Sequence, residues 1–173
     1  MSGVSAATRT AATVQLVAMR WWHIPAVGRL ELELFGDEAW SPELFWSELA
    51  SSAAYYLVAL PAGDRTADPV GYAGLSTTGA DSYIQTIGVT TSTQRSGIGR
   101  LLMLRLLAEA ERRGAEICWL EVRTDNAAAQ HLYRTLGFID RGVRRGYYQP
   151  SGADALMMAV PLPLPEHLRA SAT

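Results

Sequence analysis

The chain has 173 residues, of which 49% are hydrophobic and 18% charged, and this length and apolar content favour one soluble globular domain. A formal net charge of -2 gives no overall basic surface for nucleic acid, and no apolar run approaches the length of a membrane span. The single cysteine, Cys118, excludes an internal disulfide framework and fits a reducing compartment, so we predict a cytoplasmic protein that binds neither nucleic acid nor membrane.

Residues 1–13 are rich in Ala, Thr and Ser and lack the apolar core of a signal peptide, so we predict a flexible leader. Val14 to Met19 then alternates in the manner of a first strand. Residues 24–35 fit both a strand pattern and the helical spacing of apolar side chains. Pro25 near the start of this segment and Gly36 after its end favour a helix.

A second short helix is predicted to begin at Ser41 and Pro42, because serine is a good N-cap and proline is favoured at the first helical position. Three strands follow, over residues 53–60, 70–77 and 83–89. Turn-forming residues separate these strands, which predicts an antiparallel meander.

The rest of the chain alternates helices and strands, and Gly114 and Gly137 mark the ends of the two helices. Residues 162–173 follow the last strand, and the prolines around their start predict a flexible tail without partners. The predicted elements are a helix over residues 97–113, a strand over 117–122, a helix from Asp125 or Asn126 to Leu136, and closing strands over 138–148 and 155–160.

A glycine-rich loop joins the strand ending at Val89 to the long helix. The first amides of such a helix have no intrahelical acceptor, so they can hold a phosphate, and glycine lets the backbone approach the ligand. A tight turn with nothing bound is the alternative. The loop lacks the order of an NTPase phosphate loop or of a dinucleotide fold. Its residues are Gln94, Arg95, Ser96, Gly97, Ile98, Gly99 and Arg100.

Glu121 is the most informative residue of the strand over 117–122, because a carboxylate at the end of an apolar strand needs a partner or a purpose. A salt bridge to Arg123 and a catalytic role are both open. Strand alternation places Cys118 on the opposite face, which favours a buried structural thiol over a nucleophile. Tyr133 lies twelve residues later and fits either a place at the edge of the core or a role as an acid.

Several of these segments together resemble the GNAT superfamily of acetyl-CoA-dependent N-acetyltransferases, over residues 14–161. Within it the chain is similar to the RimI type, the ribosomal-protein alanine N-acetyltransferases. The segments are Ile87 to Arg100, Leu120-Glu121-Val122-Arg123, Asn126-Ala127-Ala128-Ala129, Leu132-Tyr133, Leu136-Gly137-Phe138, Arg144-Arg145-Gly146-Tyr147-Tyr148 and Asp154-Ala155.

The resemblance implies an α/β (α+β) GNAT fold: a mixed, mostly antiparallel, seven-stranded sheet, splayed near the cofactor and flanked by about four helices. It implies acetyl-CoA as co-substrate and no metal. Glu121 matches the general base, and Tyr133 the general acid that protonates the thiolate. The implied cofactor-binding residues are Ile87, Gly88, Val89, the loop from Gln94 to Arg100, and Asn126.

By the same resemblance the acceptor is the N-terminal α-amine of a protein or peptide, with a ribosomal protein beginning with alanine as the candidate, and the enzyme is a monomer or weak dimer. Two alternatives stay open: an acetyltransferase for a small amine such as an amino sugar or polyamine, and a non-catalytic module that binds acetyl-CoA. The implied walls of the acceptor groove are Trp40, Ser41, Arg145, Tyr147 and Tyr148.

Overall fold

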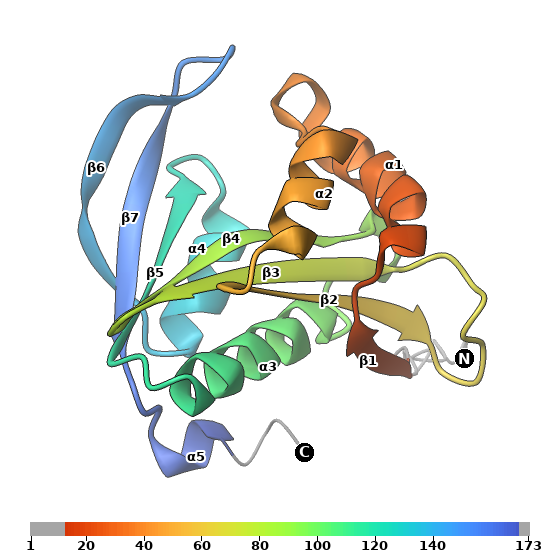
Figure 1. The fold of residues 1–173 in the computed structure, drawn as a ribbon. Helices are drawn as coiled ribbons and strands as arrows, with labels where there is room; N and C mark the ends of the chain where they lie inside the picture. Colours follow the sequence, from red (N-terminus) through yellow and green to blue (C-terminus); the bar gives the residue numbers. More distant parts are fainter. Residues whose placement is uncertain (1–12, 170–173) are drawn as a thin grey trace, which may run out of the picture.

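The computed structural model describes residues 13–169, so the predicted leader lies outside the described residues except for Thr13. One mixed sheet runs through the molecule in the order β1-β2-β3-β4-β5-β7-β6 (Figure 1). The predicted seven-stranded, mostly antiparallel sheet is confirmed. Its strands are β1 (Val14–Ala18), β2 (Ala54–Pro61), β3 (Gly71–Thr78), β4 (Asp81–Val89), β5 (Ile117–Arg123), β6 (Ile139–Tyr148) and β7 (Ala153–Pro161).

Five α-helices and three 3-10 turns lie within residues 13–169. Residues 24–35, whose sequence fits both a strand and a helical pattern, form a helix, and the apolar residues Val27 and Leu30 are buried. The helices are α1 (Ile24–Phe35), α2 (Pro42–Ala50), α3 (Ile98–Arg112), α4 (Ala127–Thr135) and the one-turn α5 (Glu166–Arg169). The 3-10 turns are η1 (Trp21–His23), η2 (Gly36–Glu38) and η3 (Thr91–Thr93).

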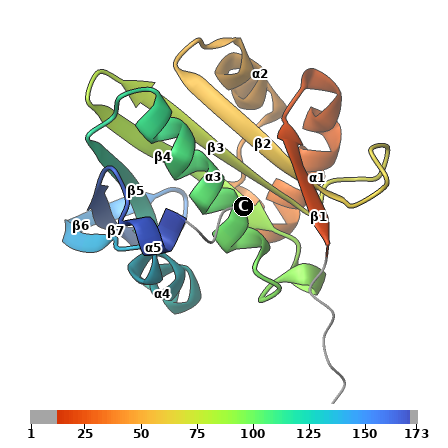
Figure 2. The same cartoon turned by 90° about the horizontal axis from the view of Figure 1, so that it is seen from below.

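The helices cover the two faces of the sheet and divide the core in two. Helices α1 and α2 lie on one face and α3 on the other (Figures 1 and 2). Phe45 of α2 packs beside Tyr56 and Tyr72 on the first face. Leu102 and Leu106 of α3 are fully buried on the second. Because both faces are covered, β2 is apolar throughout and buried over Tyr56–Leu60, and the first five residues of β3 are buried as well.

The sheet opens between β4 and β5, as the resemblance implies. The two strands are parallel and pair only over Asp81–Tyr83 and Ile117–Trp119, and they diverge beyond that point. The register of β4 against β3 also skips Gln85, because Gly74 lies opposite Thr86 while Leu75 lies opposite Ile84. A bulge of this kind bends a strand locally. The second half of β4 therefore has a free edge.

The segment after β7 corrects one prediction, because residues 162–169 have partners. The Leu162 N–H donates to the Glu116 carbonyl at 2.8 Å, and the Leu164 N–H donates to the Glu111 carboxylate at 2.7 Å. The Leu164 side chain is buried in the core beneath α3. These contacts hold the segment after β7 against the helical face. Of the helices described, none is both long and apolar enough to cross a membrane.

Candidate active site

A cleft of about 300 Å³ lies where β4 and β5 diverge, with the end of α1 on one side and the start of α4 on the other. It brings together residues predicted from four separate segments of the chain. Both predicted catalytic side chains are in its wall. The predicted site residues that line it are Trp40, Ile87, Gly88, Val89, Gln94, Glu121, Asn126, Tyr133 and Tyr148.

The glycine-rich loop continues from this cleft into the first turn of α3. Gly97 has a φ of 92° and Arg95 a φ of 62°, so the chain turns sharply before the helix. No side chain caps the helix, and the first intrahelical bond runs from the Leu101 N–H to the Gly97 carbonyl at 3.0 Å. The amides of residues 98–100 are therefore free to bind an anion at the positive end of the helix dipole.

The side chains of the loop hold it in place. The Gln94 amide donates to the Val89 carbonyl at 3.1 Å, and the Ser96 hydroxyl donates to the Thr93 carbonyl. The Arg100 guanidinium donates to the Thr135 hydroxyl at 3.3 Å, which links the start of α3 to the end of α4. A Cβ on Gly99 would lie 3.4 Å from the Leu132 side chain. These contacts fix the loop before any ligand arrives.

The free edge of β4 forms the centre of the cleft. The Thr90 N–H donates to the Val70 carbonyl at 2.9 Å, toward β3, so strand alternation turns the Val89 N–H toward the cleft. A Cβ at Gly88 would lie 2.6 Å from the Tyr72 ring. Glycine is required at position 88 because the Tyr72 ring packs directly on its backbone.

Glu121 pairs with Arg144 and not with Arg123. Its Oε1 lies 3.2 Å from Arg144 Nη1, whereas the Arg123 guanidinium binds Glu38 and Asp125. The possible salt bridge between Glu121 and Arg123 is thus wrong, although strand alternation places both residues on one face. Glu121 is partly exposed and remains accessible from the cleft.

Tyr133 sits at the inner end of the cleft, with 6% of its surface exposed. Burial, and to a lesser degree the charge of Tyr148, raises the pKa of Tyr133 above its ordinary value of 10. Its ring packs 6.0 Å from the Phe138 ring, which fixes its direction. A phenol with a raised pKa is a protonated donor across the physiological range.

Cys118 lies outside the chemistry of the cleft. Its side chain is fully buried on the α3 face of the sheet, opposite to that of Glu121, as strand alternation predicts. Burial raises the pKa of its thiol to about 12. Such a thiol is a structural group and not a nucleophile.

Two predicted site residues act as helix caps. The Asn126 side chain lines the cleft and accepts from the Ala129 N–H at 3.1 Å, which caps α4. The Ser41 hydroxyl accepts from the Leu44 N–H at 3.3 Å and caps α2. Neighbouring Trp40, by contrast, lines the cleft. The Ser41 hydroxyl thus stabilises the start of α2 next to Trp40 and does not itself line the cleft.

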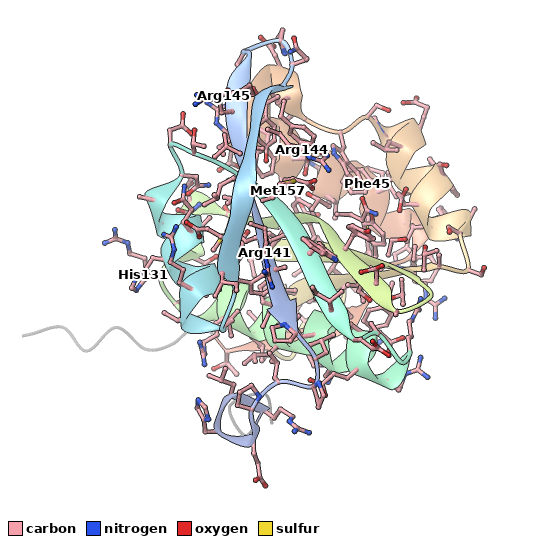
Figure 3. The ribbon with its side chains drawn as sticks, turned by 90° about the vertical axis from the view of Figure 1, so that its left-hand side faces the viewer. Phe45, His131, Arg141, Arg144, Arg145 and Met157 are labelled. Atoms are coloured by element: carbon pink, nitrogen blue, oxygen red, sulfur yellow. The ribbon has the colours of Figure 1, made fainter. Side chains whose placement is uncertain are left out.

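One of the three groove residues predicted on β6 lines the cleft. Arg144 extends to Glu121, whereas Arg145 pairs with Asp154 at 2.8 Å and is 86% exposed. The two arginine side chains lie on opposite sides of β6 (Figure 3). Tyr148 lines the cleft, while Tyr147 packs edge-on against it at 5.1 Å. The structure therefore does not bring Arg145 or Tyr147 into the cavity wall.

Glu31 is a cleft residue that the sequence did not single out. It has 2% of its surface exposed and accepts from the Trp40 N–H at 3.1 Å and from the Tyr72 hydroxyl. Burial raises the pKa of Glu31 to about 7, against the opposing effect of the Trp40 N–H. Its position four residues after Val27, on the apolar face of α1, was the available signal.

Comparison with known proteins gives one family. Residues 17–138 match the model of the acetyltransferase (GNAT) family. The chain is 47% identical to the N-alpha-acetyltransferase RimI of Mycobacterium tuberculosis over 134 residues, which are 75% of this chain and 80% of that protein. It is 37% identical to the [ribosomal protein bS18]-alanine N-acetyltransferase of Salmonella typhimurium over 71% of this chain and 81% of that protein.

Among solved structures, the chain is similar to the ribosomal-protein-S18-alanine N-acetyltransferase from Escherichia coli. The TM-score is 0.76 at 30% sequence identity, over 88% of this chain and 96% of the other. The likeness in fold and in sequence thus agrees with the free helix terminus, the free β4 edge and the presence of Glu121 and Tyr133 in one cleft. The chain belongs to the acetyltransferase (GNAT) family and is an acetyl-CoA-dependent N-acetyltransferase.

Proposed function

We propose that this enzyme transfers the acetyl group of acetyl-CoA to the N-terminal α-amine of a protein, and that its acceptor is a ribosomal protein beginning with alanine. The names of the relatives in Salmonella typhimurium and Escherichia coli support this acceptor. We further propose that the enzyme acts in the cytoplasm as a monomer or weak dimer, without nucleic acid or membrane.

The observation that carries the proposal is the placement of Glu121 and Tyr133 in one cleft with the free edge of β4. A carboxylate that can accept a proton and a protonated phenol that can donate one are suited to acyl transfer to an amine. In this proposal the loop from Gln94 to Arg100 binds the pyrophosphate of coenzyme A through the free amides of α3. Ile87, Gly88 and Val89 hold its pantetheine arm, with Asn126 beside it.

The proposed step is direct attack within a ternary complex. The lone pair of the acceptor nitrogen attacks the thioester carbonyl carbon, the C–N bond forms, and the C–S bond breaks. Glu121 takes the proton of the amine, directly or through a water, and Tyr133 gives its proton to the departing thiolate. An N–H of β4 that faces the cleft stabilises the developing oxyanion. No acyl-enzyme forms on Cys118, because that thiol is buried on the far face.

The ordinary pKa values of amines favour an α-amine. A peptide α-amino group, with a pKa of about 7.7 to 8.0, is neutral to roughly a tenth at pH 7. A lysine amine, with a pKa of about 10.4, is neutral to only about one part in a few thousand. In this proposal Glu121, which is accessible from the cleft, has only the smaller task of accepting a proton from an α-amine.

The acceptor groove is proposed to lie over Glu121, between the end of α1 and the β6–β7 hairpin. Trp40 and Tyr148 line the cleft from these two sides, and Ser41 supports the first side as a helix cap. Arg145 and Tyr147, which the resemblance assigns to the groove, would contact the acceptor only beyond the cleft.

A thiol-release assay with acetyl-CoA tests this function. The acceptors are short peptides that vary in their first two residues, with one N-terminally blocked peptide that contains lysine. We expect turnover of peptides beginning with alanine, and loss of about 100-fold or more in kcat for the isosteric variants Glu121→Gln and Tyr133→Phe. Turnover of the blocked peptide alone would overturn the α-amine assignment.

A further inference from the structure

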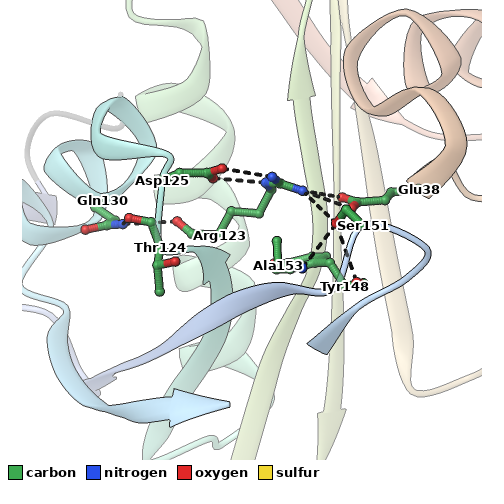
Figure 4. Close-up of polar contacts among 8 residues, drawn as sticks. All are labelled: Glu38, Arg123, Thr124, Asp125, Gln130, Tyr148, Ser151 and Ala153. Atoms are coloured by element: carbon green, nitrogen blue, oxygen red, sulfur yellow. Dashed lines mark hydrogen bonds and ion pairs between the residues drawn. The ribbon is translucent and has the colours of Figure 1, made fainter. Parts of the chain in front are cut away.

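Arg123 binds three acidic or hydroxyl side chains at once, at the end of β5 (Figure 4). Its Nη1 donates to the two carboxylate oxygens of Glu38 at 2.9 and 3.0 Å and to the Ser151 hydroxyl at 3.3 Å. Its Nε and Nη2 donate to the carboxylate of Asp125 at 3.0 and 2.8 Å. The Ser151 hydroxyl also donates to Glu38.

Two of these partners come from opposite sides of the proposed acceptor groove. Glu38 ends η2, in the connection from α1 to α2. Ser151 lies in the turn between β6 and β7. The bridge from Glu38 through Arg123 to Ser151 therefore joins two segments that are more than 100 residues apart in the chain, as their separation of 113 shows. Neither wall is connected to the other by a strand ladder at this point.

The bridge also lies next to the proposed base. Arg123 and Glu121 share one face of β5, and residues two apart on a strand are separated by roughly 7 Å. Glu38 and Arg123 line the cleft and also a second hollow of about 380 Å³, which includes Pro150 and Ser151. The Glu38–Arg123 pair thus stands at the boundary between the inner cleft and this outer hollow.

We propose that Arg123 is a positioning residue that fixes the separation of the two walls of the acceptor groove, so that the acceptor amine is delivered to Glu121. The inference rests on the proposed function, in which the first residues of the acceptor pass between these walls. The outer hollow holds the residues that follow the first residue of the acceptor. The bridge marks where the acceptor chain crosses from the inner cleft to the outer hollow.

The choice of side chain at position 123 follows from this geometry. A guanidinium presents its donors as a planar fork, so it can bind Asp125 on one side and Glu38 on the other at the same time. A lysine ammonium would lose this arrangement. With side chains 30% and 13% exposed, Arg123 and Glu38 are partly removed from water, so the pair is stronger than one on the open surface.

The acetyl-CoA site is held by separate contacts. Gln94 binds Val89, and Arg100 binds Thr135, so the loop before α3 keeps its shape through bonds that do not include Arg123. Loss of the bridge should accordingly change the binding of the acceptor and leave the binding of acetyl-CoA intact. This separation allows the inference to be tested.

The test compares steady-state kinetics of the full chain with those of Arg123→Gln, Glu38→Gln and the double variant. The acceptor is the best peptide of the panel described above. We expect each single variant to raise the acceptor KM about tenfold or more, while kcat at saturating peptide stays within about threefold. The dissociation constant of acetyl-CoA should stay within about twofold. The acceptor KM of the double variant should be no higher than that of the more impaired single variant, because both changes break the same bridge.

Asp125→Asn is the matched control. It removes the charge and one acceptor oxygen of the third partner of Arg123 but leaves both walls connected, so the acceptor KM should change by less than about threefold. An unchanged acceptor KM in Arg123→Gln would overturn the inference. An equal rise in the acceptor KM and in the dissociation constant of acetyl-CoA would also overturn it, since that result assigns Arg123 to the fold and not to the groove.

The proposed function can fail separately. If the wild-type enzyme uses only the blocked lysine peptide, the α-amine assignment is wrong, and the same variants are then measured with that peptide. A selective rise in its KM still supports the bridge, and the absence of such a rise still overturns it.

Discussion

The Tyr133 hydroxyl gains its proposed role from burial. Water is excluded from its ring by Phe138 and the surrounding core, so the ionised form is disfavoured and the pKa of Tyr133 is raised above 10. The phenol therefore keeps its proton until the thiolate departs. Glu121 differs from it in being partly exposed and paired with Arg144.

Replacement of Tyr133 by phenylalanine should lower kcat by about 100-fold, with a change of less than about twofold in the KM for acetyl-CoA. The ring is kept, so the packing against Phe138 stays. Because the pKa of Tyr133 lies above 10, the wild-type enzyme should lose no activity through this group between about pH 7 and pH 9. Measured pH–rate profiles of both forms check this. A fall in wild-type rate near pH 8 that is absent in Tyr133→Phe would contradict it.

Glu31 makes the stability of the enzyme depend on pH. Its pKa is raised from 4.5 to about 7 in the folded state, so the folded chain binds this proton more tightly than the unfolded chain does. The stability that Glu31 contributes is fully present below about pH 4.5 and is lost as the pH rises through about 7. The full loss across this pH range amounts to about 3 kcal/mol.

Glu31→Gln should remove this dependence. Glutamine can still accept from the Trp40 N–H, and it carries no proton that differs between the folded and unfolded chains. The difference in free energy of unfolding between variant and wild type should therefore shift in favour of the variant by about 2 kcal/mol from pH 5 to pH 8. Urea denaturation at both pH values measures it. A constant difference would show that Glu31 titrates normally.

At the level of elements, replacing glycine by alanine should have opposite effects on stability in α1 and in β4. Gly28 lies within α1, and no neighbouring atom comes within 4 Å of the place a Cβ would take, so Gly28→Ala should stabilise the enzyme by about 0.5 to 1 kcal/mol. In Gly88→Ala the new Cβ would meet the Tyr72 ring at 2.6 Å, which should destabilise by about 1 to 3 kcal/mol. The midpoints of thermal unfolding of the two variants measure both effects. Equal shifts in one direction would contradict the packing of Tyr72 on Gly88.

Most elements could be predicted from the sequence because their signals are local. Proline at the start of α2, the Ser41 and Asn126 caps and the alternation of β5 depend on neighbours a few residues away. The one-turn helix α5 could not be predicted in this way. It is held by Leu164 in the core and by Glu111 of α3, which are contacts between distant segments.

At the scale of the whole molecule, the residues of the candidate site divide in the same way: some have local sequence signals, and others depend on contacts between distant segments. Glu121, Tyr133 and the loop before α3 were predicted through motifs that a single segment carries. The partner of Glu121 is Arg144 of β6, and that of Arg123 is Glu38 of η2. These pairs depend on how far apart the sheet and the α1–α2 connection hold their side chains. No spacing along the chain encodes that distance, so the sequence did not show that Arg144 pairs with Glu121 or that Arg145 pairs with Asp154.

The divergence of β4 from β5 has a consequence for amide hydrogen exchange. The first residues of β4 bond to strands on both sides, whereas the later ones have β3 on one side only. In the free enzyme the Val89 N–H, which faces the cleft, should exchange rapidly, while that of Thr90, bonded to Val70, should be protected. Acetyl-CoA should slow exchange at Val89 by completing the missing edge, as an added strand would. Protection of Val89 that depends on acetyl-CoA would identify the free edge of β4 as the place where the substrate binds.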